Sequence, residues 1–368
     1  MASWLLRLMD SISNHWFEFA LPVNQTVDFL SIMYATPSRK EDPETENLVM
    51  QAFLDDFRSR TWITYRSNFP SLLDKNGCEV AIYSDAGWGC SVRATQMLVA
   101  QSLINLEFGR EWRLSGASPA ELERYKSIIA NFKDDSSAPL SIHQIVSLGH
   151  SRFGKRPSEW FGPTTSARAA EELINRASSR IGMASIVFDS GEMYTSEVVG
   201  LFNVEKNSKG ILVMVSHRLG LDSFNLARYK GTIHSLFSNP FFQGLSSGES
   251  MVSAYYFFAA CEEYLFYLDP HTVQEAFIDS ESIEAVRAAF PSQPKPLRMR
   301  WSRLNPSLTM GFVVKSPNEW DQLSQYLSKI DPELFEVFDK RKEPRVDLFI
   351  SEAESEENEI ESDMIFVN

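Results

Sequence analysis

The stretch that decides the fold is Ser84-Asp85-Ala86-Gly87-Trp88-Gly89-Cys90, which leads directly into the helix-like segment Ser91–Leu103. This order places a cysteine at the N-terminus of a helix. Unpaired backbone N–H groups and the positive end of the helix dipole favour a thiolate there, and the thiolate is the form that attacks carbonyl groups. A purely structural interpretation stays open at this point, because cysteines are often simply buried and Gly-x-Gly before a helix can be only a tight turn.

The sequence pattern changes near residue 180. Before it, periodic apolar residues and helix-start signals predict helices at Glu44–Arg58, Ser91–Phe108, Ser118–Phe132 and Ser166–Ser178. After it, short apolar runs predict strands at Ala184–Phe188, Ile211–Val215, Ser253–Ala260, Tyr264–Leu268 and Thr309–Val314, with a hairpin over Ser253–Leu268. The run Gln243–Ser250 is interpreted as a loop between strands. A helical half with a cysteine, followed by an antiparallel sheet half with a histidine, is typical of an α+β, papain-like cysteine peptidase.

Composition and charge narrow the class of protein. The 368 residues carry a net charge of −14, of which seven acids in Ser351–Asp363 supply half, and they show no basic stripe that would bind nucleic acid. Three cysteines, Cys78, Cys90 and Cys261, are too few for a disulfide scaffold and favour a reducing compartment. With no leader or membrane-length apolar run, we expect a cytoplasmic protein. Its protease domain would cover 1–341, and an acidic disordered tail 342–368.

The N-terminal segment Trp4–Phe19 has an amphipathic pattern. We expect a helix that docks on the core, with contact to a membrane surface as the alternative.

The histidine that suits the cysteine is His271, which follows a predicted strand and has Asp269 two residues before it. A carboxylate so close can orient the imidazole, although Asp-Pro-x-Thr is also a good type I turn. Upstream of the cysteine, Tyr65 carries a phenol that can donate a hydrogen bond to an oxyanion. The cysteines and histidines lack ligand spacings such as C-x-x-C or H-E-x-x-H, so we expect no metal and no other cofactor.

Four motifs together resemble a known family. They are Tyr65-Arg66-x-Asn68-Phe69-Pro70, Ser84-Asp85-x-Gly87-Trp88-Gly89-Cys90, Trp160-Phe161-Gly162-Pro163 and Leu268-Asp269-Pro270-His271-Thr272-x-Gln274. Their residues and their order closely resemble the autophagins, the cysteine proteases of autophagy. The resemblance runs from about Phe57 to Phe312 and is expected to continue to Leu334, and several motifs in register over that span make a chance match untenable.

The resemblance implies a role for each site residue. Cys90 is then the nucleophile, His271 the general base and acid, and Asp269 the partner that orients the histidine. The Tyr65 hydroxyl and the Cys90 backbone N–H would form the oxyanion hole, and Trp160 would stand beside the cleft. The lid that helps to cover the cleft would contain Gln243, Gly244, Leu245, Ser246, Ser247 and Gly248.

The resemblance also implies a substrate. Autophagins cut a ubiquitin-like autophagy modifier after its C-terminal glycine and remove the same modifier from phosphatidylethanolamine. The expected partners are therefore the modifier precursor and its lipid conjugate, with transient contact to autophagic membranes through the conjugate. The enzyme itself is expected to be a monomer with a small α/β subdomain. Two alternatives remain: another papain-like peptidase, such as a deubiquitinase, or a modifier-binding module without catalysis.

Two features fall outside this pattern. Family members often carry a modifier-binding motif near the C-terminus, in which an aliphatic residue follows an aromatic one by three positions. Here Met364-Ile365-Phe366-Val367-Asn368 follows an acidic run, but no residue lies three positions after Phe366, so the motif does not carry over. Cys78 lies twelve positions before Cys90 and suggests redox control as a hypothesis, with an inert second cysteine as the simpler interpretation.

Overall fold

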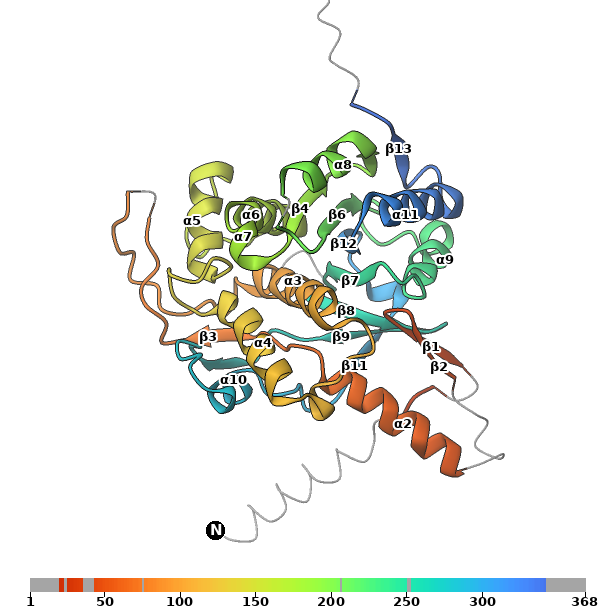
Figure 1. Cartoon of the computed structure of the whole chain (residues 1–368), viewed down its shortest axis with the longest axis horizontal. Coiled ribbons are helices and arrows are strands. Elements are labelled where there is room, and N and C mark those ends of the chain that lie inside the picture. Colours follow the sequence, from red (N-terminus) through yellow and green to blue (C-terminus); the bar gives the residue numbers. More distant parts are fainter. Residues whose placement is uncertain are drawn as a thin grey trace, which may run out of the picture.

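The computed structural model describes residues 20–22, 25–35, 43–74, 76–205, 207–249 and 253–341 (Figure 1). The predicted helix at Trp4–Phe19 and the predicted acidic tail over 342–368 lie outside the described residues. Within the part of the chain that the structure covers, no helix is long and apolar enough to cross a membrane.

Helices dominate the first half of the chain, and strands become frequent after residue 180. The helices are α2 (Pro43–Arg58), α3 (Cys90–Phe108), α4 (Pro119–Ile129), α5 (Ile142–Phe153), α6 (Pro163–Arg176), α7 (Ser178–Ile181), α8 (Thr195–Val204), α9 (Leu226–Leu236), α10 (Ile283–Ala289) and α11 (Pro317–Ile330), with 3-10 turns at Leu114–Gly116, Ala130–Phe132 and Trp301–Arg303. The strands are β1 (Thr26–Phe29), β2 (Ile32–Ala35), β3 (Tyr65–Ser67), β4 (Ala184–Phe188), β5 (Glu192–Tyr194), β6 (Ile211–Arg218), β7 (Phe242–Ser247), β8 (Tyr255–Ala260), β9 (Tyr264–Leu268), β10 (Val273–Glu275), β11 (Leu297–Arg300), β12 (Ser307–Val314) and β13 (Glu336–Phe338). The predicted helices and strands that fall on described residues are confirmed within a few residues at their ends.

One large sheet forms the centre of the molecule. Its strands run in the order β11-β9-β8-β7-β12-β6-β4, and the β1–β2 hairpin adds to it through β8. Neighbouring strands are antiparallel except β4 and β6, which are parallel. The predicted hairpin is confirmed as β8 and β9, which bring the chain back to the residues after Leu268. Two short parallel pairs, β3 with β10 and β5 with β13, lie outside this sheet.

Helix α3 is the central helix of the fold and packs against β7, β8 and β12, with α4, α5 and α6 around it (Figure 1). Every residue from Cys90 to Asn105 is buried, which is the property of a helix enclosed on all sides. The approach to the sheet is close, because a Cβ at Gly311 of β12 would lie 2.7 Å from Cδ1 of Leu98. The first turn of this enclosed helix carries Cys90.

The predicted loop Gln243–Ser250 is wrong over most of its length. Residues Phe242–Ser247 form strand β7, in which all six residues are buried and which pairs with β8 and β12 inside the sheet. The small residues fit this interior position, since a Cβ at Gly244, where φ is +100°, would lie 2.5 Å from the Phe257 carbonyl oxygen. A strand buried in this way cannot serve as a movable lid. The residues corrected are Gln243, Gly244, Leu245, Ser246 and Ser247.

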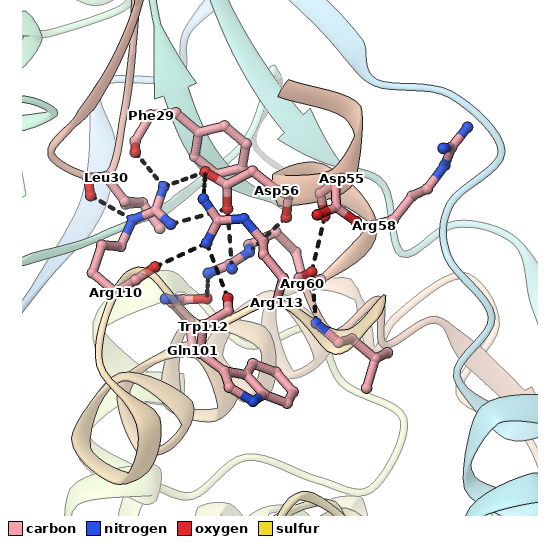
Figure 2. A network of polar contacts seen from close by, with 12 residues as sticks. Phe29, Leu30, Asp55, Asp56, Arg58, Arg60, Gln101, Arg110, Trp112 and Arg113 are labelled. Carbon is pink, nitrogen blue, oxygen red and sulfur yellow. Dashed lines mark hydrogen bonds and ion pairs between the residues drawn. The ribbon is translucent and has the colours of Figure 1, made fainter. Parts of the chain in front are cut away.

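A buried polar network joins α2, the β1–β2 hairpin and the segment after α3 (Figure 2). The carboxylate of Asp56 is fully buried and forms ion pairs with Arg60, Arg110 and Arg113 at 2.6 to 3.2 Å. Tyr34 of the hairpin donates a hydrogen bond to the same carboxylate at 2.8 Å. Arg110 also donates to backbone carbonyl oxygens at the turn of the hairpin. One carboxylate therefore fastens the hairpin to the body of the molecule.

Candidate active site

Cys90 is the first residue of α3 and is completely buried. The turn before it is held by the carbonyl oxygen of Asp85, which accepts hydrogen bonds from the backbone N–H groups of Trp88 and Gly89 at 3.2 and 2.9 Å. A side chain at Gly89 has no room, because its Cβ would lie 2.6 Å from the Cβ of Asp85. The sequence Gly-Trp-Gly-Cys thus folds as a tight turn that sets the thiol at the positive end of the helix.

His271 and Asp269 lie together directly after β9. The Nδ1 atom of His271 is 2.6 Å from Oδ1 of Asp269, and the same oxygen accepts the His271 backbone N–H at 3.0 Å. The Asp269 backbone is fixed in turn, because its N–H donates to Oε1 of Gln293 and its carbonyl oxygen accepts the indole N–H of Trp62, both at 2.7 Å. The aspartate therefore holds the imidazole by its Nδ1 side and leaves Nε2 for another partner.

Tyr65 reaches this group through a long-range strand pairing. It opens β3, whose parallel partner β10 begins two residues after His271, and its backbone N–H donates to the Pro270 carbonyl oxygen at 2.8 Å. The Tyr65 ring meets the imidazole edge-on, with ring centroids 5.4 Å apart, and Tyr255 of β8 does the same at 5.3 Å. Two tyrosines consequently restrict the movement of the imidazole plane.

The electrostatics of the site favour a thiolate and an imidazolium. Burial raises the pKa of the Cys90 thiol, but hydrogen bonds with His271, Tyr65 and Trp160 outweigh it, and the pKa lies below its ordinary value. Burial lowers the pKa of His271, yet the hydrogen bonds and charges of Asp269 and Cys90 raise it to about 9. Burial and the charge of Cys90 raise the pKa of Tyr65, so its phenol stays protonated and remains a donor.

Trp160 stands between the thiol and a cavity of about 200 Å³. Its indole N–H is buried and, apart from the Cys90 sulfur, has no hydrogen-bond partner among the described residues. Of the predicted lid residues, Gly248 lies at this cavity, since it follows the end of β7. The residues that line the cavity are Trp160, Gly162, Pro163, Thr164, Thr165, Arg218, Gly248, Ser253, Asn305 and Ser307.

The other histidines that the structure describes lie in different surroundings. Nε2 of His143 is 2.6 Å from the Pro70 carbonyl oxygen, and His234 lies 3.3 Å from Asp28. His150 belongs to α5 and His217 to β6. Across the described ranges, no group of three or more His, Cys, Asp or Glu side chains could hold a metal ion.

Three contacts of the site were not predicted from the sequence. Tyr255 touches His271, and Trp62 and Gln293 touch Asp269. The hairpin did contain a usable signal, because the pairing of Tyr256 with Leu268 sets Tyr255 beside the end of β9. Trp62 and Gln293 come from distant segments and carry no such signal.

These features together define a class of protein. A buried cysteine at a helix N-terminus, next to a histidine–aspartate pair at the end of an antiparallel hairpin, is the arrangement of a papain-like cysteine peptidase. The family follows from comparison with known proteins, since the sequence profile of the peptidase C54 catalytic domain matches residues 50–326. The chain belongs to the peptidase C54 family of cysteine proteases, the autophagins, as the motifs predicted.

Curated relatives agree with this assignment. A probable cysteine protease atg4 of Botryotinia fuckeliana is 31% identical over 305 residues, which cover 76% of this chain and 67% of the relative. The cysteine protease atg4 of Emericella nidulans is 31% identical over 294 residues, or 74% and 71% of the two chains. Cysteine protease 1 of Neurospora crassa is 31% identical over 316 residues, or 80% and 61%. The chain thus spans about two thirds of the length of these relatives.

Proposed function

We propose that this protein cleaves a ubiquitin-like autophagy modifier after its C-terminal glycine and releases the same modifier from phosphatidylethanolamine. The observation that carries the proposal is the pairing of a buried thiol with His271, with the pKa of the thiol lowered and that of the imidazole raised to about 9. Membership of the autophagin family supports the choice of substrate.

Acylation would start from the thiolate–imidazolium pair. The Cys90 sulfur attacks the glycine carbonyl carbon, and the carbonyl oxygen takes up the negative charge. The Tyr65 hydroxyl and the Cys90 backbone N–H would donate hydrogen bonds to this oxyanion. His271 then gives its proton to the leaving nitrogen, which belongs to the next residue in the precursor and to ethanolamine in the lipid conjugate. A thioester between Cys90 and the glycine remains.

Deacylation would use the same residues, with His271 now acting as a base. Neutral His271 takes a proton from water as the water oxygen attacks the thioester carbonyl, and the collapse of this tetrahedral intermediate restores the thiolate and frees the glycine carboxylic acid, which gives its proton to solvent. Asp269 stabilises the imidazolium whenever it forms, through the 2.6 Å contact with Nδ1. Cys90 is buried and Trp160 bonds its sulfur, so a residue without a side chain would approach the thiol most easily, which supports a preference for glycine.

The same proposal covers the setting of the enzyme. We propose that it acts as a monomer in the cytoplasm and meets autophagic membranes transiently through the lipidated substrate. Three free cysteines, one of them exposed, suit a reducing compartment.

The test uses the full chain with three substrates: a modifier precursor, the modifier conjugated to phosphatidylethanolamine in vesicles, and a ubiquitin fusion of similar size. Mass spectrometry should find cleavage after the glycine in the first two, an unchanged ubiquitin fusion, and neither product with Cys90→Ser. Faster cleavage of the ubiquitin fusion would identify a deubiquitinase instead. Full activity of Cys90→Ser would show that Cys90 is not the nucleophile.

A further inference from the structure

Four charged side chains lie buried behind the site, and the proposed reaction uses none of them. Arg66, Asp85, Arg93 and Asp134 are each at most 1% exposed. Buried ion pairs of this kind often contribute little net stability compared with apolar residues of the same volume. Their place between the segments that carry the site suggests a different role.

Asp85 connects the cysteine turn with the strand of Tyr65. Its Oδ1 accepts the backbone N–H of Arg66, the neighbour of Tyr65 in β3, at 2.6 Å. Its Oδ2 accepts Nε of Arg93 at 2.7 Å. Since the Asp85 carbonyl oxygen also holds the turn before Cys90, this one residue fixes the thiol relative to the phenol.

Asp134 connects helix α3, which carries Arg93, with the segment that follows His271. Its Oδ1 forms an ion pair with Nη1 of Arg93 at 2.9 Å, and its Oδ2 accepts the backbone N–H of Phe277 at 2.8 Å. The Asp134 N–H donates to the Phe277 carbonyl oxygen at 2.7 Å. Arg66 reinforces the join, because its guanidinium donates to the Glu275 carbonyl oxygen at the end of β10 at 2.9 Å.

Arg93 is the centre of this arrangement, because it lies three residues after Cys90 in the first turn of α3 and contacts both carboxylates. We propose that Arg93, Asp85 and Asp134 form a positioning unit that sets the Cys90, Tyr65 and His271 segments at fixed separations and balances the carboxylate charge behind the thiol. The proposal rests on the proposed function of Cys90. It makes Arg93 a positioning residue, since it acts through other groups.

The charge balance around the thiol gives the proposal a measurable consequence. Removing the Asp85 charge leaves Arg93 partly unbalanced, which favours the thiolate. Replacing Arg93 by lysine keeps the positive charge but removes the planar guanidinium that contacts both carboxylates. The charged and titratable groups that face the thiol or the unit come from several elements: Tyr65 and Arg66 of β3, Asp134 after α4, His143 of α5, Tyr255 of β8, and Asp269 and His271 after β9.

The experiment measures alkylation of Cys90 by iodoacetamide against pH, followed by mass spectrometry, in the full-length protein. Because alkylation needs no modifier, it tests the positioning unit even if the protein does not cleave the proposed substrate. Asp85→Asn should shift the alkylation midpoint to lower pH by about one unit. Arg93→Lys should keep the midpoint but lower the turnover of the modifier precursor at least about tenfold, since lysine cannot reach both carboxylates in the fork geometry.

The matched control is Arg60→Lys, which alters a buried arginine whose hydrogen bonds go to Asp56 and Gln101. It should lower stability without changing the midpoint or the turnover. Circular dichroism and urea unfolding identify variants that fail to fold. If Asp85→Asn does not fold, the turnover of Arg93→Lys tests the proposal. An unchanged or higher midpoint in Asp85→Asn, or equal loss of turnover in Arg93→Lys and Arg60→Lys, would overturn the proposal.

Discussion

Replacing Asp269 by asparagine tests whether its carboxylate sustains the imidazolium of His271. Asparagine keeps the size of the side chain and an oxygen that can accept from Nδ1, but it removes the negative charge. In the wild type, that charge lies 2.6 Å from Nδ1 and contributes to a His271 pKa of about 9. The substitution therefore separates the charge of Asp269 from its orienting hydrogen bond.

The expected size of the effect follows from the same values. An unperturbed histidine titrates near pH 6.5, so a pKa of about 9 corresponds to roughly 3 kcal/mol at about 1.36 kcal/mol per pH unit. Cys90 supplies part of this energy. The side chains of His271 and Asp269 are 32% and 31% exposed, so water screens the pair. We assign about 1.4 kcal/mol to the Asp269 charge, which is one pH unit or tenfold in the ion-pair equilibrium.

The assay is the pH profile of kcat/KM for cleavage of the modifier precursor. Its alkaline limb reports the loss of the imidazolium proton, because a raised histidine pKa keeps the ion pair up to pH of about 9 in the wild type. In Asp269→Asn the limb should move to about pH 8, with a maximum about tenfold lower. The control is Glu275→Gln, an exposed carboxylate nearby that bonds Asn68. An alkaline limb that stays at the wild-type pH would refute the reasoning.

Three further predictions concern the oxyanion, the buried network and the helix–sheet contact. Tyr65→Phe should lower kcat by about 10² to 10³ with little change in KM, as steady-state kinetics will show, and an unaffected kcat would exclude the phenol as a donor. Asp56→Asn should cost about 3 to 5 kcal/mol in urea unfolding, because three arginines lose their buried partner. Gly311→Ala should cost about 1 to 3 kcal/mol in the same assay through contact with Leu98.

The division of the chain into a helical half and a sheet half could be predicted because it depends on local patterns. The runs Ala184–Phe188 and Tyr264–Leu268 coincide with β4 and β9 because their apolar, β-branched and aromatic residues suit a buried strand in any context. Helix α3 was found for a similar reason, since its apolar content and the preceding glycines mark its start. Local physics is sufficient for such elements.

Strand β7 shows where local physics is insufficient. Glycine and serine are poor strand formers by themselves, so Gly244, Ser246 and Ser247 predict a loop. In the structure, a Cβ at Gly244 would lie 2.5 Å from the Phe257 carbonyl oxygen of β8, and Ser247 Oγ donates to the Ser307 carbonyl oxygen of β12 at 2.9 Å. The requirement for smallness comes from neighbours distant in sequence. Nothing within the segment itself reveals them.

The candidate site illustrates the same limit in a different way. Tyr65 and His271 are brought together by the pairing of β3 with β10, across more than 200 residues, and Asp85 and Asp134 fasten both segments to α3. No periodicity in either segment predicts that pairing. The motifs could still indicate which residues lie together, because the proposed reaction would require a particular residue type at each point: a thiol at a helix start, an imidazole with a carboxylate on Nδ1, and a protonated phenol. The residues proposed to react could therefore be recognised by their type. Arg93, Asp85 and Asp134 could not, because in the sequence they look like any other polar residues of a core.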